Sequence, residues 1–306
     1  MFIVLSLLLI SILSGTSIKV VDICDRVNVK DFWEGLDENL MQVTWSHATN
    51  SIELLDNALK DGTMMIEADV SIGSNGVIIM AHPPSTSSDL TLQNFIKTVI
   101  NARLEGGGSV RKGIKLDFKF IEAVEPALKL LREVCEDIDF PVWINADIFF
   151  MEGASQPVDK EQFIRLAKDY FPNGTLSLGF TTTSSGKYDI SNFLEALQFI
   201  EARKVTAPVT LPVRACLLAR SKPEIIQYFL QAVNVTDPTL TIWSGAEDEV
   251  DVDALVDVIN QVGRSRIYLD VPEELEKQIE EKSSSSRVTQ IIPLPALFLS
   301  LLLCFS

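Results

Sequence analysis

The sequence predicts a parallel (β/α)8 barrel of the TIM type, and two observations support this prediction. Short apolar segments with the alternation of strands recur eight times, and segments with helical spacing separate them. Strands that alternate with helices favour a parallel sheet with helices packed outside it, and eight such units can close a barrel. A doubly wound open sheet is the alternative that this pattern leaves open.

The expected elements follow one another along the chain without a low-complexity linker, so a single domain is predicted. An additional strand at residues 77–81 is expected to return from the second strand through the turn Ser74-Asn75-Gly76. Helical spacing is clear within residues 92–100, 163–170 and 255–262. The eight main strands are expected at residues 42–46, 64–70, 113–119, 142–148, 175–181, 210–216, 240–244 and 266–270.

Alternation within the strands predicts which face each side chain occupies. In residues 142–148, aliphatic residues alternate with Trp143, Asn145 and Asp147. The aliphatic face is expected to meet the helices, whereas polar residues near the carboxyl ends of strands are expected to point into the barrel, where active sites of this fold form.

Three carboxylates fall on the predicted inner face of neighbouring strands. Glu67 and Asp69 share one face of the second strand, and Asp117 lies in the third. Like charges on one buried face repel each other unless a cation intervenes. The pattern predicts a site for one divalent ion, Mg²⁺ or Ca²⁺, with buried ion pairs to Lys115 and Lys119 as the alternative.

The chain contains only two histidines, and both are predicted near these carboxylates. His47 follows the first strand and His82 follows the hairpin after the second. Two imidazoles beside a divalent ion would suit acid and base catalysis of phosphodiester cleavage, and Lys119 could offset developing negative charge. The alternative is that both histidines are ordinary polar residues at strand ends.

Several motifs resemble the menorin family of secreted or membrane-tethered animal proteins, which is similar to the phospholipase C-like and glycerophosphodiester phosphodiesterase superfamily. The resemblance covers nearly the whole chain between its two apolar ends. It rests on the segments Trp45-Ser46-His47-Ala48-Thr49-Asn50-Ser51, Glu67-Ala68-Asp69-Val70, Lys115-Leu116-Asp117-Phe118-Lys119, Trp143-Ile144-Asn145-Ala146-Asp147-Ile148 and Pro212-Val213-Arg214-Ala215.

The resemblance implies a phosphodiesterase-type barrel in which the three carboxylates bind Mg²⁺ or Ca²⁺ and the two histidines serve as acid and base. It also implies a different function, because at least one nematode relative patterns neuronal dendrites through cell-surface partners. Two readings follow. One is a metal-dependent phosphodiesterase for a glycerophosphodiester or lysophospholipid-type substrate. The other is an inactive recognition or adhesion protein, for example in neuronal or epithelial patterning.

One departure from the phosphodiesterase pattern concerns phosphate binding. Glycerophosphodiesterases commonly have Arg-Gly after the first histidine, where this chain has Ala48-Thr49. Lys119 or Arg214 could supply the missing contact, although Arg214 could instead pair with Asp147 or Asp270.

Further candidate substrate contacts have structural alternatives. Asn50 could contact substrate or cap the following helix in a capping box with Glu53. Trp143 and Trp243 could form ligand platforms or simply pack, and Asn145 is a further candidate at the barrel opening.

The two ends of the chain predict export and tethering. Residues 1–17 resemble a signal peptide, residues 18–282 are expected to form the barrel, and residues 283–306 resemble a GPI-anchor signal. An uncleaved tail anchor and a simple hydrophobic terminus are the alternatives for the last segment. The expected location is the extracellular cell surface.

Composition agrees with an exported, acidic protein. The formal net charge of −16 disfavours nucleic acid as a partner. Asn173 and Asn234 lie in glycosylation sequons. Cys24, Cys135 and Cys216 remain if the tail is removed, which allows at most one disulfide and one free thiol.

Overall fold

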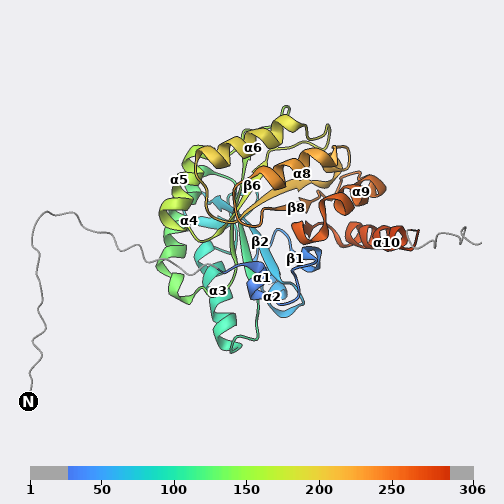
Figure 1. Ribbon diagram of the computed structural model, residues 1–306. Helices are drawn as coiled ribbons and strands as arrows, with labels where there is room; N and C mark the ends of the chain where they lie inside the picture. Colours follow the sequence, from blue (N-terminus) through green and yellow to red (C-terminus); the bar gives the residue numbers. More distant parts are fainter. Residues whose placement is uncertain (1–26, 290–306) are drawn as a thin grey trace, which may run out of the picture.

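The computed structural model describes residues 27–289 and confirms a nearly closed barrel of parallel strands surrounded by helices (Figure 1). The hydrogen-bonded order is β1-β2-β4-β5-β6-β7-β8-β9, and β3 pairs antiparallel with β2 as the predicted hairpin. The strands are β1 Trp45–Ser46, β2 Met65–Ile72, β3 Ile78–Met80, β4 Gly113–Phe118, β5 Val142–Phe149, β6 Thr175–Phe180, β7 Val209–Arg214, β8 Thr239–Trp243 and β9 Ile267–Asp270.

Helices connect successive strands and cover the outside of the barrel (Figure 1). Several begin at a residue whose side chain accepts a hydrogen bond from the first turn, such as Ser51, Thr91 and Asp159. The helices are α1 Val29–Phe32, α2 Ile52–Lys60, α3 Leu92–Glu105, α4 Ile121–Glu133, α5 Lys160–Tyr170, α6 Ile190–Ala202, α7 Ala215–Leu218, α8 Pro223–Ala232, α9 Val252–Val262 and α10 Glu273–Thr289, with 3-10 turns at Leu40–Gln42, Cys135–Asp137 and Arg264–Arg266.

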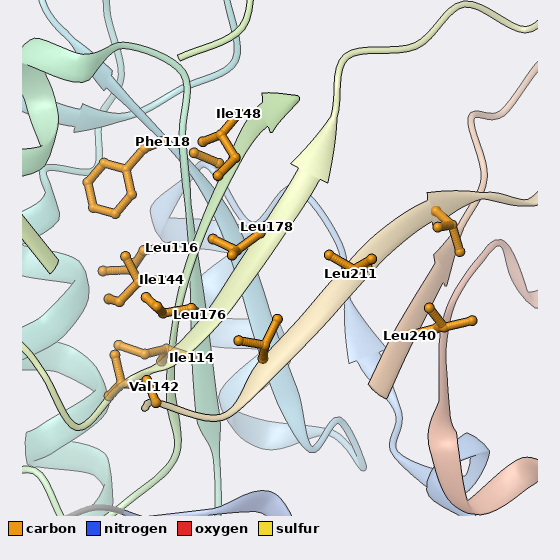
Figure 2. Packing of buried hydrophobic residues seen from close by; sticks show 14 of the residues in the cluster. Ile114, Leu116, Phe118, Val142, Ile144, Ile148, Leu176, Leu178, Leu211 and Leu240 are labelled. Atoms are coloured by element: carbon orange, nitrogen blue, oxygen red, sulfur yellow. The ribbon is translucent and has the colours of Figure 1, made fainter. Parts of the chain in front are cut away.

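The main core lies between the barrel and its helices. Ile114, Leu116 and Phe118 of β4 are at most 1% exposed, and Figure 2 shows them packed with the corresponding residues of neighbouring strands. Burial of a large apolar side chain contributes roughly 1.5–3 kcal/mol, so this layer provides much of the stability. The predicted aliphatic outer face is therefore confirmed.

A second apolar cluster closes the barrel interior at the end where the strands begin, which we call the lower end. Met65, Trp143 and Tyr268, which begin their strands or lie near the beginning, are buried there against Trp45. The rings of Trp143 and Tyr268 meet edge to face with centroids 4.9 Å apart. Because this end is filled, polar chemistry is restricted to the carboxyl ends of the strands.

Strands β1 and β9 are the two ends of the hydrogen-bonded path, and side chains bridge the seam between them. Near the lower end, the rings of Trp45 and Tyr268 lie 6.3 Å apart. At the upper end, His47 Nδ1 lies 3.0 Å from Asp270 Oδ1. These two contacts, one apolar and one polar, bridge the seam at its two ends.

Some predicted strand boundaries were wrong; residues 215 and 216, for example, were expected in a strand but lie in α7. Residues 42–46 were expected to form a strand, but the 3-10 turn Leu40–Gln42 precedes a β1 of only Trp45–Ser46. The last helix α10 continues past residue 282 to Thr289, and Ser283 is buried in it. The expected signal peptide and most of the expected tail lie outside the described residues.

Three further sequence features can be placed. Cys135 is disulfide-bonded, whereas Cys216 is a buried free thiol. Asn234 is exposed after α8, and Asn173 is partly buried before β6. Across residues 27–289, no helix is both long enough and apolar enough to cross a bilayer.

Candidate active site at the carboxyl ends of the strands

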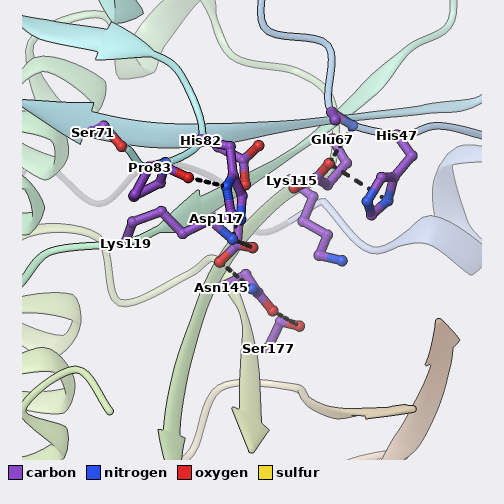
Figure 3. Close-up of polar contacts among 12 residues, drawn as sticks. His47, Glu67, Ser71, His82, Pro83, Lys115, Asp117, Lys119, Asn145 and Ser177 are labelled. Carbon is purple, nitrogen blue, oxygen red and sulfur yellow. Dashed lines mark hydrogen bonds and ion pairs between the residues drawn. The ribbon is translucent and has the colours of Figure 1, made fainter. Parts of the chain in front are cut away.

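Three carboxylates meet at the opening of the barrel. Glu67 and Asp69 extend from β2, and Asp117 extends from β4, where parallel pairing aligns Asp69 with Asp117. One oxygen from each of the three lies within 4.8 Å of the others. Figure 3 shows Glu67 and Asp117 with Lys115, Lys119 and the two histidines. The convergence predicted from strand alternation is confirmed.

Glu67 is the most deeply buried of the three, at 2% exposure. Burial, together with repulsion from Asp69 and Asp117, raises its pKa to about 7 despite the attraction of His47 and Lys115. The backbone N–H of Ala48 donates to Glu67 Oε2 over 2.7 Å. Ala48 adopts a left-handed φ of 50°, a conformation that costs about 1 kcal/mol or more outside glycine.

Lys119 bridges the other two carboxylates. Its Nζ lies 2.8 Å from Asp69 Oδ1 and 2.5 Å from Asp117 Oδ2. Burial alone would raise the pKa of Asp117, but the charges of Lys119 and Lys115 and a hydrogen bond from Asn145 lower it. The predicted ion pair of Lys119 is therefore present in this structure. A cation bound by Asp69 and Asp117 would compete with Lys119 for their oxygens.

Two amide side chains hold the carboxylates in place. Asn50 Nδ2 donates to Asp69 Oδ2 over 2.6 Å, and Asn50 Oδ1 accepts the Asp69 backbone N–H over 2.9 Å. Asn145 Nδ2 donates to Asp117 Oδ1 over 2.6 Å, while Asn145 Oδ1 accepts from the Ser177 hydroxyl. Both amides are thereby oriented as supports for the carboxylates. The helix-capping alternative for Asn50 was wrong, because Ser51 caps α2.

His47 is positioned by Asp270, a residue that ends β9. Burial by itself would lower the pKa of His47, but the hydrogen bond and charge of Asp270, with the charge of Glu67, raise it to about 9. Asp270 is also 3.3 Å from Lys115 Nζ. Burial opposes ionisation of Asp270, yet Lys115 and His47 together lower its pKa to about 2.

His82 is an exposed residue held beside the cluster by the β2–β3 hairpin. The preceding residue, Ala81, donates its backbone N–H to the Asp69 carbonyl over 2.9 Å. His82 Nδ1 lies 2.7 Å from the Pro83 carbonyl oxygen. A carbonyl only accepts, so Nδ1 carries the proton in this contact and Nε2 is left for a ligand.

Arg214 and Trp243 lie on a different part of the opening, at the ends of β7 and β8. Arg214 donates from Nε and Nη2 to the two oxygens of Asp248, at 2.8 and 2.6 Å. Its guanidinium carbon lies 5.1 Å from the centre of the Trp243 ring. The predicted pairing of Arg214 with Asp147 or Asp270 was wrong, because Asp248 takes that place.

Trp143 does not reach the opening. It is 2% exposed and belongs to the apolar cluster at the opposite end of the barrel interior. The ligand-platform alternative for Trp143 is therefore wrong, and the packing alternative holds.

Sequence reasoning missed the roles of two further acidic residues. Asp270 was considered as a partner of Arg214 but not as the partner of His47. Asp147 lies on β5 two residues beyond Asn145, and burial together with the charge of Asp117 raises its pKa to about 7. Gly179 leaves room for it, because a Cβ there would stand 2.0 Å from Asp147 Oδ1. Alternation places both on the inner face but does not reveal their partners.

The donor set suits a hard divalent cation. All three side chains offer carboxylate oxygens, the ligands that Mg²⁺ and Ca²⁺ prefer. Burial is the largest cause of the raised pKa of Glu67, with repulsion from Asp69 and Asp117 adding to it, so a cation bound here would favour the ionised carboxylate. The cluster could bind one such ion if Lys119 moves away from Asp69 and Asp117.

The barrel is similar in fold to solved structures of other proteins. Over 81% of this chain and 99% of the other, the structure is similar to a putative glycerophosphodiester phosphodiesterase from Galdieria sulphuraria, with a TM-score of 0.51 and 10% sequence identity. A putative glycerophosphoryl diester phosphodiesterase from Silicibacter pomeroyi covers 80% of the chain and 96% of its own, with a TM-score of 0.48 and 11% identity. At these identities the likeness shows the fold alone.

Two sequence comparisons give the family. Residues 39–276 match the menorin N-terminal domain. The chain is 35% identical to human Protein FAM151B over 245 residues, which are 77% of this chain and 84% of the relative. The chain therefore belongs to the menorin family, as its motifs predicted.

Proposed function

We propose that this protein is a metal-dependent phosphodiesterase that acts on a glycerophosphodiester or lysophospholipid-type substrate. The observation that carries the proposal is the convergence of Glu67, Asp69 and Asp117, with ligand oxygens within 4.8 Å of one another, beside His47 at the barrel opening. The phosphodiesterase-like fold supports the same class of substrate.

Glu67, Asp69 and Asp117 would hold the ion, Mg²⁺ or Ca²⁺. When bound, such an ion supplies positive charge that polarises and orients a phosphoryl group. Asn50 and Asn145 keep two of the carboxylates in fixed orientations, so the ligand oxygens need little rearrangement when an ion binds.

The hydrogen bonds of the two histidines suggest different roles for them. His47, with its pKa raised to about 9, holds a proton at neutral pH and can donate from Nε2 to a leaving alkoxide. His82 donates from Nδ1 to the Pro83 carbonyl, so in the neutral ring Nε2 is an acceptor that can take a proton from the attacking hydroxyl or water. His47 is thus the proposed acid and His82 the proposed base.

Lys119 would neutralise charge on the phosphate. Its ammonium group is shared between Asp69 and Asp117 in this structure. If it turns from them toward the barrel opening, it can offset negative charge that develops during cleavage. The phosphate contact that Ala48 cannot make is thereby assigned to Lys119 rather than to Arg214, whose guanidinium is engaged by Asp248.

We also propose that the protein acts outside the cell, attached to its surface. The apolar ends of the sequence and its two glycosylation sequons support export, and the small residues before the terminal apolar segment support a GPI anchor. Release from transfected animal cells by phosphatidylinositol-specific phospholipase C is expected. Retention with an intact tail would contradict the anchor.

The test of the enzyme proposal combines ion binding with turnover. Calorimetry should show one Mg²⁺ or Ca²⁺ bound, and Asp69→Asn should abolish binding while Asp257→Asn, an exposed change on α9, leaves it intact. A phosphodiester panel should reveal turnover that requires the ion and falls roughly 100-fold or more in His47→Asn and His82→Asn. Equal ion binding by wild type and Asp69→Asn would contradict the ligand assignment.

A second candidate function is surface recognition without turnover. The observation that favours it is the pair of ion pairs that Lys119 forms with Asp69 and Asp117. An inactive barrel of this kind would bind cell-surface protein partners. Absent turnover with every phosphodiester, together with partner binding that survives His47→Asn, would establish this alternative.

A further inference from the structure

Exposed apolar side chains gather at the same end of the barrel as the site. Within residues 27–289, eight large apolar residues are exposed. Two of them lie elsewhere, Leu104 at the end of α3 and Tyr228 within α8. The other six lie in segments that follow the carboxyl end of a strand, and we call them the apolar rim: Ile52, Leu54, Val77, Phe120, Phe150 and Ile190.

The rim residues lie along the part of the opening formed by β1 to β6 rather than along one helix. Phe120 directly follows Lys119, and Phe150 directly follows β5, so the two aromatic rings adjoin the strands that carry Asp117 and Asn145. They are 42% and 45% exposed. Val77 lies in the turn between β2 and β3, and the remaining three lie in the first turns of α2 and α6.

Single exposed apolar residues are ordinary on a protein surface, but several around one polar opening indicate contact with an apolar partner. The rim comes from five separate segments and is therefore suited to a broad surface rather than to one peptide. The partner must present apolar area and a phosphodiester at the same time. A lipid aggregate satisfies both requirements, because its headgroup phosphates lie directly above its acyl chains.

We propose that the apolar rim rests on the surface of a zwitterionic lipid aggregate, such as a phosphocholine membrane or micelle, and brings lipid headgroups to the carboxylate cluster. The net charge of −16 disfavours binding to an anionic lipid surface, so lipids with zwitterionic headgroups suit this protein better. The proposal rests on the proposed phosphodiesterase and narrows its substrate to one presented by an interface.

The rim can be altered without disturbing the fold. Phe120 occupies the N-cap position of α4 without a side-chain cap, and serine is a favoured residue there. Phe150 lies in the loop after β5. The test variant is therefore Phe120→Ser/Phe150→Ser. The matched control is Leu104→Ser/Tyr228→Ser, which removes two apolar side chains outside the rim that are at least as exposed, at 62% and 49%.

The experiment measures flotation with phosphatidylcholine vesicles and with vesicles that also contain lysophosphatidylcholine. Wild type and the control should bind the vesicles with the same affinity. The affinity of the rim variant should be lower by about tenfold or more, because the lost apolar contact area reduces partitioning into the vesicles. Turnover of lysophosphatidylcholine micelles should fall in the rim variant, whereas turnover of soluble glycerophosphocholine should not change.

Equal vesicle binding by the rim variant and wild type, or no vesicle binding by wild type, would overturn the inference. An equal loss in the control variant would overturn it too, because the effect would not belong to the rim. If no substrate is turned over but the rim variant alone loses vesicle binding, the proposed enzyme fails and the lipid-binding surface stands.

Discussion

Asp270→Asn should lower the pKa of His47. Asp270 Oδ1 is 3.0 Å from His47 Nδ1, and its hydrogen bond and charge are the largest contributions that raise the pKa of this imidazole from 6.5 to about 9. A partner charge at this distance shifts a pKa by roughly 1–3 units, so most of the rise should disappear. Asparagine keeps the size of the side chain and can still accept one hydrogen bond.

The pKa of His47 can be measured by NMR, and the assay is simple because a chain with two histidines gives only two imidazole signals to follow. His82→Asn identifies the His47 signal by elimination. In wild type the His47 signal should titrate near pH 9, and in Asp270→Asn it should titrate at least one unit lower. A midpoint that does not move between the two proteins would refute the reasoning that Asp270 controls the proton on His47.

The same contact makes stability depend on pH. The folded-state pKa of His47 lies above its unfolded value, so its contribution is complete below about pH 6.5 and is lost as pH rises toward 9. More than half of the His47 side chain is exposed, so solvent weakens the effect. In Asp270→Asn, the decline of unfolding free energy across this window should be smaller than in wild type.

Three further predictions concern the interior of the barrel. Gly179→Ala should lower the melting temperature by several degrees, since its Cβ would stand 2.0 Å from Asp147 Oδ1, whereas Gly62→Ala, with no atom within 4 Å, should change it little. Asp147→Asn should increase the unfolding free energy, measured by urea denaturation in EDTA, by up to a few kcal/mol at pH 7.5 and by almost nothing near pH 4. The reason is that a carboxyl whose pKa is raised to about 7 by folding destabilises the fold once it is ionised. An equal gain at both pH values would contradict this. Trp143→Ala should destabilise the fold by about 3–5 kcal/mol yet leave the ion affinity of the folded protein unchanged, and a lost ion site in folded variant protein would show that the two ends of the barrel are coupled.

Strand alternation determined much of this protein from sequence alone. It identified the parallel barrel, its aliphatic outer layer and the inward side of Glu67, Asp69 and Asp117, because a side chain's face depends only on its position within a strand. Short motifs around these residues were sufficient to indicate the menorin family. The disulfide state of Cys135 was not determined, because pairing depends on distances that spacing does not give.

Only the tertiary structure decided how high each inward residue lies in the barrel and what it contacts there. Trp143 and Asn145 share one face of β5, yet the first is buried at the lower end while the second donates to Asp117. His47 and Asp270 are 223 residues apart and meet because barrel closure brings the first and last strands together. Alternation has a period of two residues and therefore fixes a face, whereas height and partners depend on the register between strands and on closure of the sheet.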